Sequence, residues 1–453
     1  MKKSLLAALF ATVLSPVAFA HEDPPGSGTF VNPVIEICVS EFGATPDDGN
    51  ADTVAIQAAI DAAMKTGKHS LRFESGIYEI DDTIHIRRRQ GLKITGEGAL
   101  LWQRPDQPKI SGQGTAIVWT GTDLTKPMFR YRGSELVMAD IAIWGAEWSS
   151  TDPTSYAAYG FVSTVREAAS GPDDENGETQ NGETPDPVGV GAGKVNFHNV
   201  TFAFLEVGVH VSDPSTTDTD LEVNGDNLVF TGRTRFWHCE TGLKTLSDQN
   251  MGFHFQNLHA TKCEVVFDFY RGGGLKVERV LMQGDPASAQ EPIYLRLEKP
   301  ATNNGYFLTE FMKIDGGTKN PTIVDMVGTT NPQAKITFNH LHMSTANDYE
   351  NTLFNLRGAA MLTVRDAVFR DKYNDPDPGQ EGPAVLLDLT ESGGGYRPNV
   401  HFDRVRFDGD AIDLVVEDAT QGGFFFSGSN CLRTDGVPHN DWKFTEDSFP
   451  PSP

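Results

Sequence analysis

Cysteine is scarce in this chain of 453 residues, which contains Cys38, Cys239, Cys263 and Cys431. Four cysteines in a chain of this length do not make a disulfide framework, and no Cys-x-x-Cys pair indicates a zinc site. Cys239 and Cys263 are 24 residues apart, and each directly precedes a glutamate. We expect them to stack on neighbouring turns of a repeat. Free thiols are favoured over the alternative of a disulfide bond, because parallel neighbours are poorly placed for its geometry.

Basic residues are also few, with 37 lysines and arginines against 62 acidic residues and a formal net charge of -25. Phosphates would be repelled by such a chain, so the composition disfavours nucleic acid and anionic membranes as partners. Acidity does not identify a substrate, and its simplest consequence is colloidal solubility.

Long apolar runs are absent beyond the first twenty residues, so we expect no membrane anchor. Residues 1–20 have the form of a signal peptide: Lys2 and Lys3, a short apolar region, and Ala18-Phe19-Ala20 before the expected cleavage site. The prediction is a secreted or periplasmic protein. Residues 21–33 are rich in proline and glycine and are expected to be a linker.

The sequence contains no specific metal-binding motif. No histidine spacing is typical of a transition-metal site, so no metal ligands are predicted. Asp47, Asp48 and Asp52 could form a calcium loop, but a polar turn followed by a helix cap explains them better. Cofactors are therefore left unassigned, with calcium open and without a specific motif.

The stretch after the linker carries the most recognisable sequence. Its informative segments are Val39–Ala44, Asp47–Thr53, Ala55–Ile60, Phe73–Ile80 and Ile94–Gly98. They resemble the N-terminal module of the pectate-lyase-like superfamily, of the rhamnogalacturonase and epimerase type, with a departure at Ser75, where a proline is usual. The resemblance covers about 60 residues. It implies a right-handed parallel β-helix, a fold that lyases, hydrolases, epimerases and inactive proteins share.

A helix is predicted inside this module. Ile56, Ala59, Ile60, Ala63 and Met64 lie on one face at helical spacing, Asp52 or Thr53 can cap the helix, and Gly67 can end it. We expect this helix to cover the open end of the β-helix, where an unpaired strand edge would otherwise be exposed. The cap module and first rungs are assigned to residues 34–100.

One apolar-polar-apolar pattern recurs through the rest of the chain. Its central residues are His210, Lys244, Asp268, Arg296, Asp325, Asn355, Asp388 and Asp413, at intervals of 34, 24, 28, 29, 30, 33 and 25 residues. Recurrence at this interval is typical of a solenoid, and alternation directs the central residues outward. We therefore predict an all-β, single-stranded parallel β-helix over residues 101–430, with a long acidic loop at about 147–192 and a tail at 431–453.

The central residues also suggest where chemistry could occur. In related β-helices a polysaccharide lies along the outer face of one parallel sheet, and stacked strands about 4.8 Å apart match a linear polymer. Two schemes stay open. In a hydrolase, Asp268 and Asp325 would lie about 9.6 Å apart, near the limit for an inverting pair. In a lyase or epimerase, Lys244 or Arg296 would act near the proton abstracted from a uronic acid. A plain ladder of surface ion pairs is the alternative.

A cluster of Arg233, Arg235, Trp237 and His238 is the predicted substrate-binding segment. Tryptophan stacks on sugar rings and arginine pairs with carboxylates. We expect this segment to lie between strands and to wall the groove, although packing of a loop against the coil would also explain it.

These observations predict an exported, polysaccharide-active β-helix enzyme with Lys244, Asp268, Arg296 and Asp325 as candidate catalytic residues. Its expected partner is an acidic polysaccharide. Lyase chemistry is favoured over hydrolysis or epimerisation, although no motif specific for any of these families is present. The alternative is a non-catalytic polysaccharide-binding or envelope structural protein.

Overall fold

The computed structural model describes residues 36–66, 69–88, 91–99, 114–133, 135–146, 156–164, 193–214, 227–246, 252–270, 273–284, 291–298, 305–315, 321–327, 334–345, 352–371, 385–390, 398–408, 415–417, 425–429 and 431–433. The expected signal peptide, the linker, most of the acidic loop, Asp413 and residues 434–453 lie outside this set.

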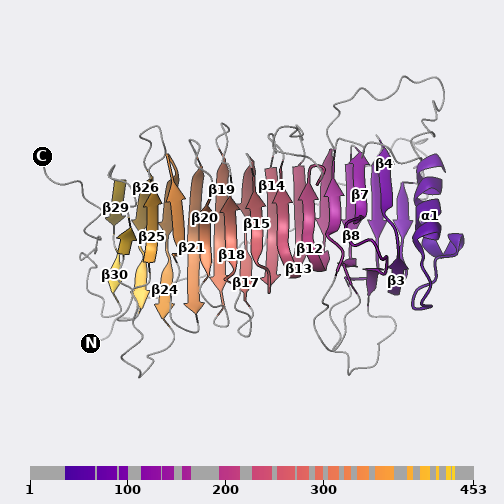
Figure 1. Ribbon diagram of the computed structural model, residues 1–453, viewed down its shortest axis with the longest axis horizontal. Helices are drawn as coiled ribbons and strands as arrows, with labels where there is room; N and C mark the ends of the chain where they lie inside the picture. The colour runs from indigo at the N-terminus through magenta and orange to yellow at the C-terminus, as the bar shows by residue number, and fades with distance from the viewer. Residues whose placement is uncertain are drawn as a thin grey trace, which may run out of the picture. The chain divides into compact units, whose positions relative to one another are not determined.

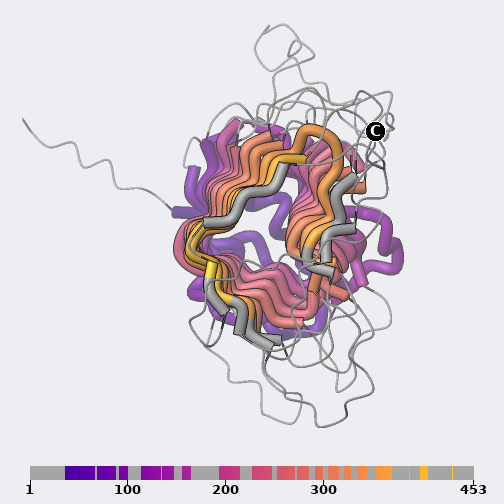
Figure 2. Tube along the Cα trace, turned by 90° about the vertical axis from the view of Figure 1, so that its left-hand side faces the viewer, coloured from indigo at the N-terminus to yellow at the C-terminus, as the bar shows by residue number. Residues whose placement is uncertain are grey.

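The described chain is a parallel β-helix, as the sequence predicts. Every strand pairing in it is parallel, and each strand pairs with the equivalent strand of the next rung. Viewed along the axis, the rungs superpose as layers around a common interior (Figure 2). The pairings define three sheets, which we call sheets I, II and III.

Sheet I carries the predicted column. It consists of β4 (Ile84–Arg88), β7 (Pro127–Gly133), β10 (Tyr159–Ser163), the ends of β12 (Thr201–Val211) and β13 (Asn227–Thr245), β15 (Val265–Phe269), β18 (Ile293–Leu297), β20 (Thr322–Met326), β22 (Phe354–Arg357), β25 (Val385–Thr390) and β28 (Val415–Glu417).

Sheet II follows sheet I along the chain. It consists of β1 (Ile37–Cys38), β2 (Ser70–Arg72), β5 (Leu92–Thr95), β8 (Glu135–Ala139), β11 (Lys194–His198), the starts of β13, β14 (Gly252–Thr261), β19 (Tyr306–Ile314) and β21 (Lys335–Thr345), and β16 (Gly274–Val277), β23 (Met361–Arg365), β26 (Asn399–Asp403) and β29 (Phe425–Ser429).

Sheet III completes each rung. It consists of β3 (Gly76–Ile80), β6 (Thr115–Trp119), β9 (Ala142–Trp144), the start of β12, the middle of β13, the ends of β14, β19 and β21, and β17 (Val280–Gln283), β24 (Val368–Asp371), β27 (Arg406–Asp408) and β30 (Leu432–Arg433).

The long strands turn from sheet to sheet at residues with left-handed backbone. Between sheets II and III of β13 the turn is at Gly232, with φ of 65°, and between sheets III and I it is at His238, with φ of 50°. A Cβ atom at position 232 would lie 2.2 Å from Asn199 Oδ1, so a glycine fits this corner. Asn199 itself has φ of 51° and donates to Asp140 Oδ1 at 2.9 Å, which stacks one corner on the next.

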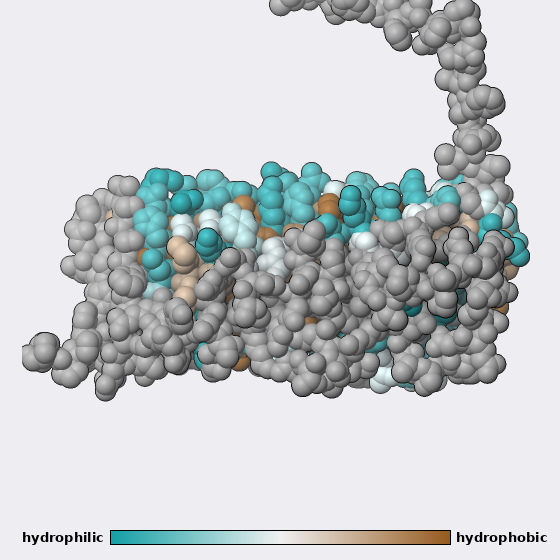
Figure 3. Space-filling view, turned by 90° about the horizontal axis from the view of Figure 1, so that it is seen from above, coloured by the Kyte–Doolittle hydropathy of each residue, from teal (hydrophilic) through white to brown (hydrophobic). Residues whose placement is uncertain are grey.

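The interior is a continuous apolar core with stacked aromatic rings. Phe230 lies between Phe197 and Phe255, with ring centroids 4.9 and 3.9 Å away. All three side chains are buried. The outside is polar by contrast, and Figure 3 shows hydrophilic side chains along much of one long face.

Helix α1 (Thr53–Thr66) lies at the N-terminal end of the stack, after the 3-10 helix η1 (Val39–Phe42) (Figure 1). Its predicted face is confirmed, because Ile56, Ala59, Ile60, Ala63 and Met64 are all buried. The side chain of Asp52 accepts a hydrogen bond from the Thr45 amide, at 2.9 Å. No helix among the described residues is long and apolar enough to cross a membrane.

The predicted cysteine stack is confirmed. Thr241 pairs with Val265, which places Cys239 and Cys263 at equivalent positions of neighbouring rungs. Both are buried and free, and each thiol contacts a backbone carbonyl of the preceding rung, Phe202 for Cys239 and Phe236 for Cys263. Burial is the main cause that raises the pKa of Cys239.

Two assigned ranges and one residue of the column differ from the prediction. Strand β10 lies within the range assigned to the acidic loop, so that assignment is wrong for Tyr159–Ser163, which pair with β7 and β12 as a regular rung. Strand β30 lies within the predicted tail and pairs with β27. At the end of the column, Asp388 pairs with Glu417, so Glu417 occupies the position expected for Asp413.

Candidate functional site

The predicted column exists on sheet I. Successive pairings join His210, Lys244, Asp268, Arg296, Asp325, Asn355 and Asp388 in one register. Apolar neighbours of the central residues, such as Phe267 and Phe269, belong to the core. The central side chains therefore project from the outer face, as strand alternation predicts.

Projection outward does not mean exposure at every position. His210 and Asp268 are each only 2% exposed, whereas a solvated strand face was the simple alternative. The side chains of Lys244 and Arg296 are 29% and 31% exposed. The column therefore has half-buried cations on rungs next to those of a buried acid and a buried imidazole.

Two ion pairs join the four predicted catalytic residues two by two. Lys244 Nζ lies 3.0 Å from Asp268 Oδ2, and Arg296 Nε lies 3.5 Å from Asp325 Oδ2. Asn355 donates to the other oxygen of Asp325 at 3.0 Å. The second oxygen of Asp268 is buried without a hydrogen-bond partner among the described residues. Each cation is thus fixed by a carboxylate less exposed than itself.

His210 and Tyr159 extend this group by two rungs, and neither was chosen from the sequence as a site residue. The two rings meet edge to face, 5.4 Å apart. Burial, together with the negative charge of Glu206, raises the pKa of Tyr159. Little in the sequence indicated that these two residues belong to a site. His210 was one polar residue in an apolar pattern, and Tyr159 lay in a segment expected to be a loop.

His210 is a neutral imidazole at pH 7. Burial lowers its pKa to about 4, against the hydrogen bond with the Ser212 carbonyl. That carbonyl, 2.9 Å from Nδ1, can only accept a hydrogen bond, so Nδ1 carries the proton and Nε2 has the free lone pair. In this tautomer the imidazole can accept a proton directly at Nε2.

The depressed pKa of His210 predicts acid sensitivity. Between about pH 6.5 and pH 4 the unfolded chain binds a proton at this residue that the folded chain does not bind. The free energy of unfolding should therefore fall by about 3 kcal/mol as pH decreases through this window. Urea unfolding at pH 7, 6, 5 and 4 measures this loss. His210→Asn keeps a donor for the Ser212 carbonyl but cannot titrate, and an unchanged pH dependence in this variant would contradict the assignment.

The predicted Arg-Trp-His segment lies elsewhere than expected. It is not a loop between strands, because Asn227–Thr245 form the continuous strand β13. Trp237 lies on sheet III and packs against Phe204, with ring centroids 5.0 Å apart, next to a separate apolar cluster around Trp144. The turn at His238 separates it from Lys244, so this segment faces away from the column and does not wall it.

A groove on sheet II was missed by the sequence reasoning. It has a volume of about 640 Å³ and runs across strands β8, β11, β13, β14, β16 and β19. Gly252 and Gly274 form part of its floor, and Asn227 and Tyr306 lie at their two sides. The sequence signal was a glycine at the start of two successive strands, Gly252 and Gly274, followed by Tyr306 at the start of the next.

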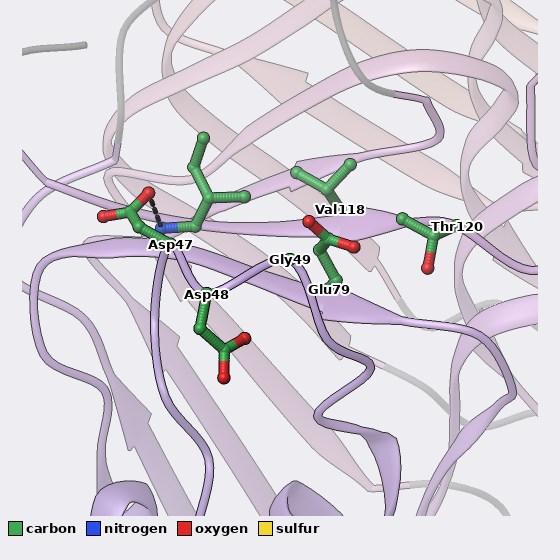
Figure 4. A pocket seen from close by; sticks show the side chains of 7 residues that line it. Asp47, Asp48, Gly49, Glu79, Val118 and Thr120 are labelled. Carbon is green, nitrogen blue, oxygen red and sulfur yellow. Dashed lines mark hydrogen bonds between the residues drawn. The ribbon is translucent and has the colours of Figure 1, made fainter.

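A smaller hollow of about 240 Å³ lies near the N-terminal end, lined by Asp47, Asp48 and Glu79 (Figure 4). Asp47 accepts a hydrogen bond from the Ile77 amide at 3.3 Å, and Asp48 accepts one from the Asn50 amide at 2.9 Å. These bonds are those of a polar turn. Among the described residues, no group of three or more His, Cys, Asp or Glu side chains could hold a metal ion.

Comparisons with known proteins add little to this geometry. No family model and no curated protein sequence matches the chain. The A-module of the Azotobacter vinelandii mannuronan C-5 epimerase AlgE4 is similar over 87% of this chain and 95% of its own, with 16% identity and a TM-score of 0.44. A tailspike of an Acinetobacter phage covers 92% of this chain and 67% of its own, with 9% identity and a TM-score of 0.46.

A third similar structure is the catalytic unit of a GH87 α-1,3-glucanase from Streptomyces thermodiastaticus. It covers 95% of this chain and 72% of its own, with 11% identity and a TM-score of 0.41. At these values the likenesses carry no argument about function, and the parallel β-helix rests on the strand pairing itself. The specific N-terminal module stays an expectation from the sequence.

Proposed function

We propose that this protein is exported, binds an acidic polysaccharide along the sheet I column and cleaves it by β-elimination. Lys244 and Arg296 would each bind and neutralise the carboxylate of a different uronic acid residue. The imidazole of His210 would accept the proton from the carbon beside the carboxylate held by Lys244. The electron pair left on that carbon would form a double bond as the bond to the glycosidic oxygen breaks, and water would protonate the leaving oxygen. Asp268 and Asp325 would hold the two cations in position.

The observation that carries this proposal is the pair of half-buried cations, each of which lies against a less exposed acid. Lys244 and Arg296 are two rungs apart, about 9.6 Å along the stack. A chain of sugars lying along the column could therefore bring acidic groups to both. Neutralising a carboxylate stabilises the negative charge that develops when the neighbouring carbon loses its proton.

His210 suits the role of proton acceptor better than Lys244 does. The ammonium of Lys244 is engaged by Asp268, with Nζ 3.0 Å from Oδ2. The imidazole of His210 is neutral at pH 7 and lies on the adjacent rung. His210 is buried with the Tyr159 ring packed against it, so contact with a substrate would require the side chains around it to rearrange.

Hydrolysis fits the column less well. The candidate pair is Asp268 and Asp325, and an inverting hydrolase needs room between its two carboxyl groups for a water molecule. Here Arg296 lies between them in the register, and each carboxylate contacts a cation.

A second candidate function is binding without catalysis. It is favoured by the same ion pairs, since opposite charges stacked along a strand column also form a purely structural ladder. In that case the cations would hold a polysaccharide without removing its proton.

The test is to incubate the purified protein with polygalacturonate, alginate and other polyuronates. β-Elimination creates an unsaturated uronate, which absorbs in the ultraviolet, whereas hydrolysis creates reducing ends without this absorbance. We expect rising ultraviolet absorbance with at least one substrate. Reducing ends without absorbance would contradict elimination, and binding without either product would support the non-catalytic function.

A further inference from the structure

The sheet II groove has a bare floor bounded by larger side chains. Asn227 pairs with Gly252, and Gly274, one rung further, pairs with Tyr306. The two glycines stand next to each other, because the residues that follow them, Phe253 and Leu275, are paired. Two successive rungs without side chains leave a hollow about 10 Å long between the asparagine and the tyrosine.

Tyr306 gives this hollow an aromatic wall. Tyr306 is 49% exposed and is among the few large apolar residues that the described surface exposes. An exposed ring of this kind, with a polar tip, is suited to stack against the apolar face of a sugar. Asn227 on the other side offers both a donor and an acceptor for hydroxyl groups.

The charged side chains at the groove are balanced. Glu135, Lys194 and Lys276 line it, and Glu278 pairs with Lys276 beside it. His254 Nε2 lies 2.9 Å from Glu278 Oε1, and Lys276 Nζ lies 3.5 Å from the same oxygen. The hydrogen bond with His254 is the main cause that lowers the pKa of Glu278. The three side chains are similarly exposed, at 38%, 47% and 39% for His254, Lys276 and Glu278. In the sheet I column the cations are instead more exposed than the acids.

We propose that the sheet II groove is a second carbohydrate site, which binds a short stretch of neutral sugar residues with one ring stacked on Tyr306. The volume of about 640 Å³ lies within the range of small-ligand sites. The balanced edge offers hydrogen bonds to hydroxyl groups without a net charge that would attract a uronate. The site is on a different sheet from the column, so it does not depend on the cleavage proposed there.

Two variants test the groove from opposite directions. Tyr306→Ala removes the stacking ring, and Gly252→Leu fills the floor. A Cβ atom at position 252 would lie 3.7 Å from Asn227 Oδ1 and 4.0 Å from the Gly274 carbonyl oxygen, which are ordinary contacts. Phe311→Ala is the matched control, because Phe311 lies on the same strand and is 42% exposed, but does not line the groove.

The measurement is affinity electrophoresis of the full chain in gels containing glucan, mannan, galactan or polygalacturonate. We expect retardation by at least one neutral polysaccharide, weakened about tenfold in both groove variants and unchanged in Phe311→Ala. Arg296→Ala should leave this retardation intact and weaken that by polygalacturonate. Absence of retardation by all neutral polymers, or equal retardation of both groove variants and wild type, would overturn the proposal.

Discussion

Replacing Arg296 by alanine is expected to lower the rate of polyuronate cleavage at least about a hundredfold, with little change in melting temperature. The guanidinium is one of the two half-buried cations of the column, and its loss removes the group that would hold a second carboxylate and so position the polymer for proton removal near Lys244. Asp325 keeps the hydrogen bond from Asn355 and is 20% exposed, so it is not left as a buried unpaired charge. Initial rates of ultraviolet absorbance measure the effect.

The matched control for Arg296 is Lys313→Ala. Lys313 also pairs with an aspartate, Asp315, at 3.6 Å and is 42% exposed, but it lies on sheet III. Its loss should leave turnover unchanged. If Arg296→Ala turned over the substrate at the wild-type rate, the proposed site would be ruled out, but the conclusion about the fold would stand.

Lys244 needs a different experiment from Arg296. Lys244→Ala alone would leave Asp268 buried without its cation, and the loss of stability, typically about 3–5 kcal/mol, would obscure the loss of activity. The double variant Lys244→Met with Asp268→Leu removes both charges together. Comparing it with Arg296→Ala separates a catalytic role of the pair from its contribution to folding.

Replacing Phe255 by alanine is expected to lower the free energy of unfolding by about 3–5 kcal/mol. Phe255 is fully buried, stacks on Phe230 at 3.9 Å and meets Phe267 edge to face at 5.1 Å. Removing the ring opens a cavity that the flanking rungs cannot fill, because each rung is held in register by its neighbours.

Urea denaturation followed by circular dichroism measures this loss. Phe311→Ala, at an exposed position, should change stability by less than about 0.5 kcal/mol. Equal effects of the two substitutions would show that the aromatic stack does not carry the stability of the coil.

The fold and the column could be predicted because both depend on local pattern. A strand directs alternate side chains to opposite faces, so an apolar-polar-apolar pattern recurring through the chain fixes which residues face outward. Stacked rungs then bring those residues into one line. The same reasoning placed Cys239 beside Cys263, since both occupy one position of the repeat.

Sequence alone therefore determined the parallel β-helix, its capping helix and the register of Lys244, Asp268, Arg296 and Asp325. Tertiary structure decided which of these side chains are buried, that Trp237 faces away from the column, and that the glycines of sheet II leave a groove. The burial of a side chain, and the direction in which it points beside a corner, depend on how the chain turns between sheets and on which residues pack over it. These contacts join residues far apart in the chain, and no local pattern records them.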